Sequence, residues 1–150
     1  MRETSTDIDF EANARMMLRQ DRFCRWAGMQ LVDVGEDHAS VSMAVRPEMI
    51  NAFGVCHGGV TFALADSAFG TAANADGKMA LALEVNISYT KKVFTGDQLI
   101  ARAQRKSDSA KVAVYEVTVT NQKEETVALF RGTVYKTNRS VEEKYQGNYE

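Results

Sequence analysis

Apolar and polar residues alternate along most of the second half of the chain. The alternation falls into four segments, separated by the polar runs Thr95-Gly96-Asp97, Ser107-Asp108-Ser109 and Asn121-Gln122-Lys123-Glu124-Glu125. A period of two is typical of a strand that buries one face. It predicts strands at 81–92, 97–106, 110–121 and 126–137. Because the links between these segments are short, we expect the four strands to be antiparallel neighbours.

The first half of the chain combines helical spacing with two further strands. Apolar residues recur three or four positions apart in 7–27, which predicts one helix that ends at Gly28. Two shorter segments predict strands at 29–34 and 38–46. Pro47 ends the second of them, because proline has no N–H group for the sheet.

Residues 58–76 predict a second helix, with apolar residues on nearly every face. A helix of this kind is buried. The loop 48–57 precedes it, and Gly77 is suited to cap its end. Since an antiparallel sheet needs a cover on one face, the fold class predicted is α+β, with a long curved antiparallel sheet wrapped around a central buried helix. The polar residues 138–150 predict a loose tail.

Composition and charge narrow the function classes. The chain has 150 residues and a formal net charge of -2, which suits one domain and argues against a nucleic-acid partner. A polar N-terminus without a signal sequence and the small number of cysteines predict a cytoplasmic protein, and no apolar stretch is long enough to span a membrane. No metal site is expected, because the histidines and cysteines lack ligand spacing: they are Cys24, His38, Cys56 and His57.

Asp66 is the most distinctive candidate for chemistry. It is the only ionisable side chain between His57 and Asp76, and it lies in the middle of an apolar helix. An ionised carboxylate in such surroundings costs several kcal/mol unless it is paired or hydrogen-bonded. Asp66 is therefore either a structural group, at a solvated edge or paired with an arginine, or a general base or nucleophile with a raised pKa.

A second candidate lies at the start of the same helix. Gly58 and Gly59 leave the first backbone N–H groups unobstructed, so they could bind an anion or a developing oxyanion. His57 is either a brace or a packed histidine, and Asn51 could bind a carbonyl or close a turn. A thiol–imidazole pair of Cys56 and His57 is disfavoured, because neighbours in sequence seldom face each other.

The spacing of the two candidates bears on assembly. Gly58 and Asp66 are eight residues apart, or about 12 Å along a helix, so both cannot reach one small electrophile from the same chain. If both act together, they come from two copies with antiparallel central helices. The sequence then favours a homodimer with two equivalent sites.

These residues resemble a known family, the hotdog-fold acyl-CoA thioesterases of the phenylacetyl-CoA thioesterase (PaaI-like) type. The resemblance covers roughly residues 28–137. It is carried by an H-G-G motif with an acid nine positions after the histidine, within Asn51-Ala52-Phe53-Gly54-Val55-Cys56-His57-Gly58-Gly59 and Leu64-Ala65-Asp66, and by Asn86-Ile87-Ser88-Tyr89, Gly96-Asp97 and 127–132.

The resemblance implies roles for residues at matching positions. The Gly58 N–H would polarise the thioester carbonyl, and Asp66 of the other subunit would activate water or attack the carbonyl. His57 and Asn51 would orient the thioester and the loop, beside Gly59. It also implies a dimer, usually paired into a tetramer, and no cofactor other than the coenzyme A that is part of the substrate.

Two departures from the family pattern concern the substrate pocket. Gly70 stands where a hydroxyl residue is common, with Thr71 next to it, and Glu84 and Asn86 occupy the alternative strand position. We expect these polar residues to line the pocket. Basic residues would meet the phosphates of coenzyme A, and the candidates lie at strand ends: Lys91, Lys92 and Arg105.

The sequence thus predicts an N-terminal helical segment at 1–28, a hotdog thioesterase domain at 29–137 and a polar tail at 138–150. The expected function is hydrolysis of an aryl- or medium-chain acyl-CoA to the free acid and CoA, as in phenylacetic acid degradation. The alternative is a non-catalytic module that binds or senses acyl-CoA. A hotdog dehydratase ranks last, because His38 lies on a predicted turn.

Overall fold

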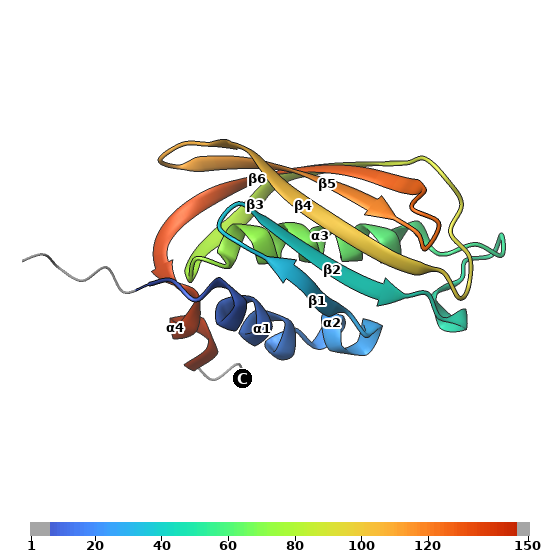
Figure 1. Ribbon diagram of the computed structural model, residues 1–150, viewed down its shortest axis with the longest axis horizontal. Helices are drawn as coiled ribbons and strands as arrows, with labels where there is room; N and C mark the ends of the chain where they lie inside the picture. Colours follow the sequence, from blue (N-terminus) through green and yellow to red (C-terminus); the bar gives the residue numbers. More distant parts are fainter. Residues whose placement is uncertain (1–6, 147–150) are drawn as a thin grey trace, which may run out of the picture.

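A six-stranded antiparallel sheet curves over one face of the central helix α3 in the computed structural model, which describes residues 7–146 (Figure 1). The predicted fold class is therefore confirmed. The elements run in this order: α1 (Phe10–Gln20), α2 (Arg22–Ala27), β1 (Gln30–Val34), β2 (His38–Ala44), a 3-10 turn η1 (Pro47–Met49), α3 (Gly58–Asn74), β3 (Lys78–Tyr89), β4 (Gln98–Asp108), β5 (Val112–Thr120), β6 (Thr126–Ser140) and α4 (Val141–Gln146).

The sheet has the strand order β1-β2-β4-β5-β6-β3, so β3 and β4 are not neighbours. The prediction that the last four strands pair in sequence is wrong for this pair. The connection 90–97 is long enough to cross the end of the sheet, and β3 pairs instead with β6. As a result β3 is an edge strand, with one row of backbone groups that no other strand of residues 7–146 pairs with.

Helix α3 packs against the inner face of five strands, β2 to β6. Its buried face combines small residues with Leu64 and Phe69, which are fully or almost fully buried. The closest approach to the sheet is at Gly132 of β6, where an added Cβ would lie 2.6 Å from a ring carbon of Phe69. Burial on the sheet side leaves the opposite face of α3, which carries Asp66, outside this core.

The N-terminal region forms two helices where one was predicted. The break falls at Asp21, whose extended backbone (ψ 107°) ends α1 and whose carboxylate accepts a hydrogen bond from the Cys24 N–H at 2.9 Å. Asp21 is thus an N-cap for α2, a role that short acidic side chains favour. Gly28 ends α2 in the left-handed region (φ 71°), as predicted. Leu18 and Cys24 are part of the main core, so this region packs on the same domain.

The ends of two other elements differ from expectation. Helix α3 is capped at Ala75, and Gly77 (φ 85°) instead forms the turn that leads into β3. The predicted loose tail is wrong over 138–146, because β6 continues to Ser140 and α4 follows; residues 147–150 lie outside the described part. None of the helices within 7–146 has the length and apolar character needed to cross a membrane.

Candidate active site

The first turn of α3 presents one backbone N–H group that is free to bind a ligand. The His57 ring caps the helix, because its Nδ1 accepts a hydrogen bond from the Gly59 N–H at 2.9 Å. The Val60 N–H donates to the His57 carbonyl at 2.9 Å. Among residues 7–146, the Gly58 N–H donates no hydrogen bond. Gly58, at the positive end of the helix dipole, therefore offers a donor for a developing oxyanion.

The loop before α3 is held by Asn51. Its side-chain oxygen accepts hydrogen bonds from the Phe53 N–H (2.9 Å) and the Val55 N–H (3.3 Å). The His57 N–H is bound by the Met49 carbonyl at 2.8 Å. Of the two roles that the sequence left open for Asn51, the structure favours the one that closes a turn.

A cavity of about 360 Å³ lies beside Gly58. It brings Gly58 together with Tyr89, Lys91 and Lys92 at the end of β3, two of which were predicted to meet phosphates. Lys91 is paired with Glu125, whereas Lys92 has no ion-pair partner among residues 7–146. The cavity thus combines a free amide with a nearby cation, which suits an anionic substrate that carries a carbonyl group.

The Asp66 carboxylate is exposed in the single chain and makes no hydrogen bond or ion pair within the described residues. Of the two structural alternatives, a pair with an arginine is therefore not observed, whereas a solvated position on the helix is what the single chain shows. Partial burial, and then the negative charge of Asp21, raise the pKa of Asp66 above its ordinary value. Helix α2 lies beside this face of α3, since the Cys24 thiol and the Ser67 hydroxyl are 3.3 Å apart.

Four other predicted residues do not join this cavity. Thr71 is buried on the sheet side of α3, away from the face of Asp66. Glu84 and Asn86 are exposed and alternate along β3 with the inward-facing Val85. Arg105 lies 3.6 Å from Asp108 and lines a different cavity, next to the C-terminal end of α3.

The thiol and the metal alternatives gain no support. Cys56 is buried, and burial raises the pKa of its thiol. Its sulfur contacts the His57 carbonyl oxygen (3.6 Å) and the Thr61 hydroxyl (3.9 Å), and it makes no hydrogen bond to the His57 ring. In the described part of the chain, no group of three or more His, Cys, Asp or Glu side chains could hold a metal ion.

Tyr89 is the site residue that sequence reasoning missed. Its hydroxyl donates a hydrogen bond to the Gly58 carbonyl at 2.8 Å. In the sequence it stood out only as an apolar member of an alternating strand and as part of the family resemblance. No local signal indicates that the end of β3 meets the start of α3, because 31 positions separate the two residues.

A curved antiparallel sheet around one central helix defines a hotdog fold. Comparison with known proteins gives the same answer. The pattern of the Thioesterase superfamily matches residues 53–128. The acyl-coenzyme A thioesterase PaaI of Escherichia coli is 36% identical over 129 residues, which cover 86% of this chain and 92% of PaaI. The chain therefore belongs to the thioesterase superfamily.

Solved structures agree with this membership. The E. coli PaaI structure, from the phenylacetic acid degradation operon, superposes with a TM-score of 0.85 at 35% identity, covering 87% of this chain and 95% of PaaI. A Streptococcus mutans protein bound to acetyl-CoA gives a TM-score of 0.71 at 30% identity, covering 75% and 90% of the two chains. The predictions of a PaaI-like hotdog fold and of a thioester hydrolase are confirmed.

Proposed function

We propose that this protein hydrolyses acyl-CoA thioesters to the free acid and CoA, with Gly58 of one subunit and Asp66 of another at each active site. One observation carries the proposal: α3 holds a free N–H at Gly58, beside a cavity, and an unpaired carboxylate at Asp66. The eight residues between them correspond to about 12 Å, so the two groups meet one thioester only if two chains contribute. The acyl-CoA substrate of PaaI and the acetyl-CoA bound to the S. mutans protein support the substrate class.

The chemistry follows from these two groups. Asp66 accepts a proton from a water molecule, whose oxygen forms a bond to the thioester carbon. The Gly58 N–H donates a hydrogen bond to the carbonyl oxygen as it becomes an oxyanion. The C–S bond then breaks, and the CoA thiolate takes up the proton. A raised pKa makes Asp66 a stronger base than an ordinary aspartate at neutral pH. Direct attack by Asp66, followed by hydrolysis of the anhydride, gives the same products.

The exposed edge of β3 supports the homodimer that this arrangement needs. Leu81 and Leu83 on this strand are 51% and 62% exposed, which is unusual for large apolar side chains side by side on a long edge strand. Pairing of two β3 strands would cover both residues and continue the sheet across the dimer. We expect a dimer, paired further into a tetramer, in light scattering after size-exclusion chromatography.

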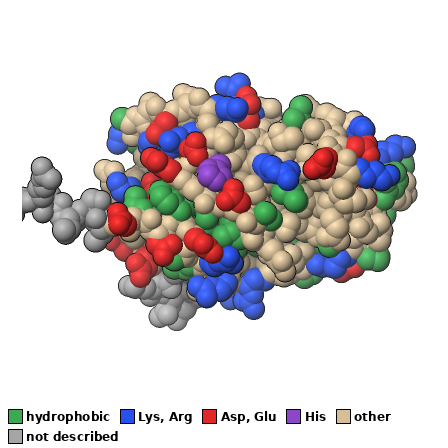
Figure 2. Space-filling view, in the orientation of Figure 1, with side chains coloured by type: hydrophobic (Ala, Val, Ile, Leu, Met, Phe, Trp, Pro, Cys, Tyr) green, Lys and Arg blue, Asp and Glu red, His purple; other side chains and the backbone are tan. Residues whose placement is uncertain are grey.

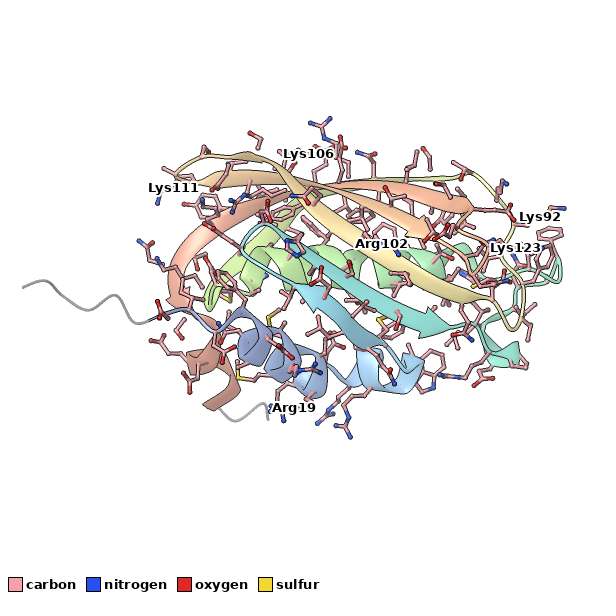
Figure 3. All side chains as sticks on the ribbon, viewed as in Figure 1. Arg19, Lys92, Arg102, Lys106, Lys111 and Lys123 are labelled. Atoms are coloured by element: carbon pink, nitrogen blue, oxygen red, sulfur yellow. The ribbon has the colours of Figure 1, made fainter. Side chains whose placement is uncertain are left out.

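Basic residues near the cavity support a site for the phosphates of CoA. A second cavity of about 330 Å³ shares Lys91 and Lys92 with the first and adds Lys123 and the half-exposed Phe94. Figure 3 shows Lys92 and Lys123 at the same end of the molecule, and neither has an ion-pair partner within residues 7–146. Figure 2, drawn in the same orientation, shows basic side chains beside acidic ones at that end, and over the rest of this face acidic and basic side chains are interspersed. We propose that Lys92 and Lys123 contact the phosphates, and that Arg105 does not.

The first experiment measures release of CoA thiol from acetyl-, hexanoyl-, decanoyl-, benzoyl- and phenylacetyl-CoA. We expect turnover of aryl- or medium-chain substrates, and Asp66→Asn to lower kcat by about 10²–10⁴-fold. Asp76→Asn is the matched control, because Asp76 follows α3 but lies far from Gly58; it should retain wild-type activity. Tight binding without turnover by the wild type would instead support the acyl-CoA-sensing alternative.

A complementation experiment tests the two-chain site. Gly58→Pro removes the N–H at the first helical position, where the backbone tolerates proline. Because a Cβ on residue 58 would also lie 3.1 Å from Tyr89, Gly58→Ala, which adds a Cβ and keeps the N–H, is the control for that steric effect. Asp66→Asn and Gly58→Pro should each be inactive alone. Random mixing of the two chains should restore about a quarter of wild-type activity, because half of the dimers are mixed and each mixed dimer has one intact site. Failure to recover activity in demonstrably mixed dimers would contradict a shared site.

A further inference from the structure

The peptide group between Gly58 and Gly59 is held at both of its ends. Its N–H is bound by the His57 ring at 2.9 Å, and its carbonyl oxygen accepts a hydrogen bond from the Tyr89 hydroxyl at 2.8 Å. One of the two partners is close in sequence and the other is distant: His57 directly precedes α3, whereas Tyr89 is the last residue of β3. The Gly58 N–H, on the preceding peptide, is the group left free.

Tyr89 also fixes Gly58 by packing. A Cβ on residue 58 would lie 3.1 Å from both the ring Cζ and the hydroxyl oxygen of Tyr89, so the ring approaches the Gly58 Cα closely. Partial burial raises the pKa of the Tyr89 phenol. The group therefore stays protonated at neutral pH and can act as the donor.

We propose that Tyr89 is a positioning residue for the thioesterase reaction, which acts by fixing the orientation of the Gly58 N–H. This inference rests on the proposed function only for its kinetic consequence. Glycine has the greatest backbone freedom of any residue, so an unrestrained Gly58 would sample several orientations of its amide. The hydrogen bond from the Tyr89 hydroxyl to the Gly58 carbonyl, and the packing of the Tyr89 ring against the Gly58 Cα, reduce that freedom. Oxyanion stabilisation depends on a donor that is oriented before the reaction begins.

The kinetic test is Tyr89→Phe, which keeps the ring and removes the hydroxyl. We expect kcat to fall by about 3–10-fold, the factor that corresponds to the loss of one hydrogen bond, and KM to change by less than about 2-fold. Tyr135→Phe is the matched control, because Tyr135 is a half-exposed tyrosine on β6 whose ring faces Lys111; its kinetics should equal those of the wild type. An increase in KM at constant kcat, or no change in either, would overturn the inference.

A structural test is independent of activity. Amide hydrogen exchange by NMR should show that Tyr89→Phe speeds exchange of the Gly59 N–H by about 3–10-fold, while Tyr135→Phe leaves it unchanged. Unchanged exchange at Gly59 would overturn the positioning role even if activity falls. If the folded wild type cleaves no acyl-CoA, the proposed function fails, and the exchange measurement still decides whether Tyr89 holds this peptide.

Discussion

The contact between Gly132 and Phe69 sets how closely the central helix approaches the sheet, and it allows a sharp prediction. A Cβ added at Gly132 would lie 2.6, 2.7 and 2.8 Å from three ring carbons of Phe69. Two non-bonded carbons normally stay about 3.5–4.0 Å apart, so the ring or the helix would have to move by roughly 1 Å. The ring is 1% exposed and is packed against Tyr115 and Phe130, with centroids 5.8 and 5.6 Å away. The displacement would therefore spread to these neighbours.

Gly132→Ala should accordingly destabilise the protein by about 1–3 kcal/mol, the usual cost of overpacking a core. For a domain of this size each kcal/mol corresponds to about 2–4 °C in the midpoint, so Tm should fall by roughly 3–10 °C. Differential scanning calorimetry of the purified variant measures both quantities at one protein concentration. Because the cause is steric, the sheet itself should remain intact in circular dichroism.

A double variant separates this cause from a general intolerance of the position. Phe69→Leu alone leaves a cavity and should also lower Tm. In the combination of Phe69→Leu with Gly132→Ala, the added methyl group fills part of that cavity. The combined loss should therefore be smaller than the sum of the two single losses. Additive losses, or a Gly132→Ala midpoint within about 1 °C of the wild type, would refute the reasoning.

Two further predictions concern ionisation. Asp21→Asn keeps an N-cap for α2 but removes a negative charge that raises the pKa of Asp66. The acid limb of the profile of kcat/KM against pH should therefore move to lower pH. If that limb does not move, burial alone raises the pKa of Asp66. The His38 ring is hydrogen-bonded to Asp37 (2.9 Å), and its Nε2 lies 3.0 Å from an Asp33 carboxylate oxygen. The hydrogen bond to Asp37 first, and then the charge of Asp33, raise the pKa of His38. A raised pKa in the folded state stabilises the protein fully below the unfolded pKa of about 6.5, and this contribution disappears as pH rises through the folded value. His38→Gln should therefore lower the free energy of unfolding, measured by chemical denaturation, more at pH 5.5 than at pH 8.5. The difference should be about 1 kcal/mol or less because the cluster is largely exposed, and equal losses at the two pH values would contradict this account.

The sequence predicted helices and strands well where burial of one face imposes a period on the apolar residues. It predicted them poorly where a single side chain decides where an element ends. In β2 the predicted apolar positions Ala39, Val41 and Met43 are all buried, and Ser40 is the one polar position of the alternation that is buried as well. The break between α1 and α2, in contrast, depends on the cap that Asp21 makes, and an aspartate between two helical segments reads equally well as an exposed helical residue. The C-terminal region is a similar case: its polar composition predicted a loose tail, whereas the structure has the helix α4 there.

For the candidate site, too, the sequence could predict some residues and not others. Gly58 and Asp66 could be found because each is exceptional in its own segment: a glycine pair at a helix start and a lone acid in an apolar helix. Glu84 and Asn86 were expected in the pocket; in the single chain they are exposed on the face of β3 opposite Val85, and their place in a pocket shared by two chains stays a prediction. The side of the sheet that faces a pocket depends on strand register, which one bulge shifts.

By itself, then, the sequence determined the class of fold, the central helix and the two groups proposed for its chemistry, because these depend on periodicity and on the cost of placing a charge in an apolar helix. The tertiary structure decided which strands pair, so that β3 lies at the edge beside β6. It also decided that Tyr89 meets Gly58 and that Arg105 lies elsewhere. These are contacts between residues distant in sequence. They follow from how the whole sheet closes around the helix, which no local pattern encodes.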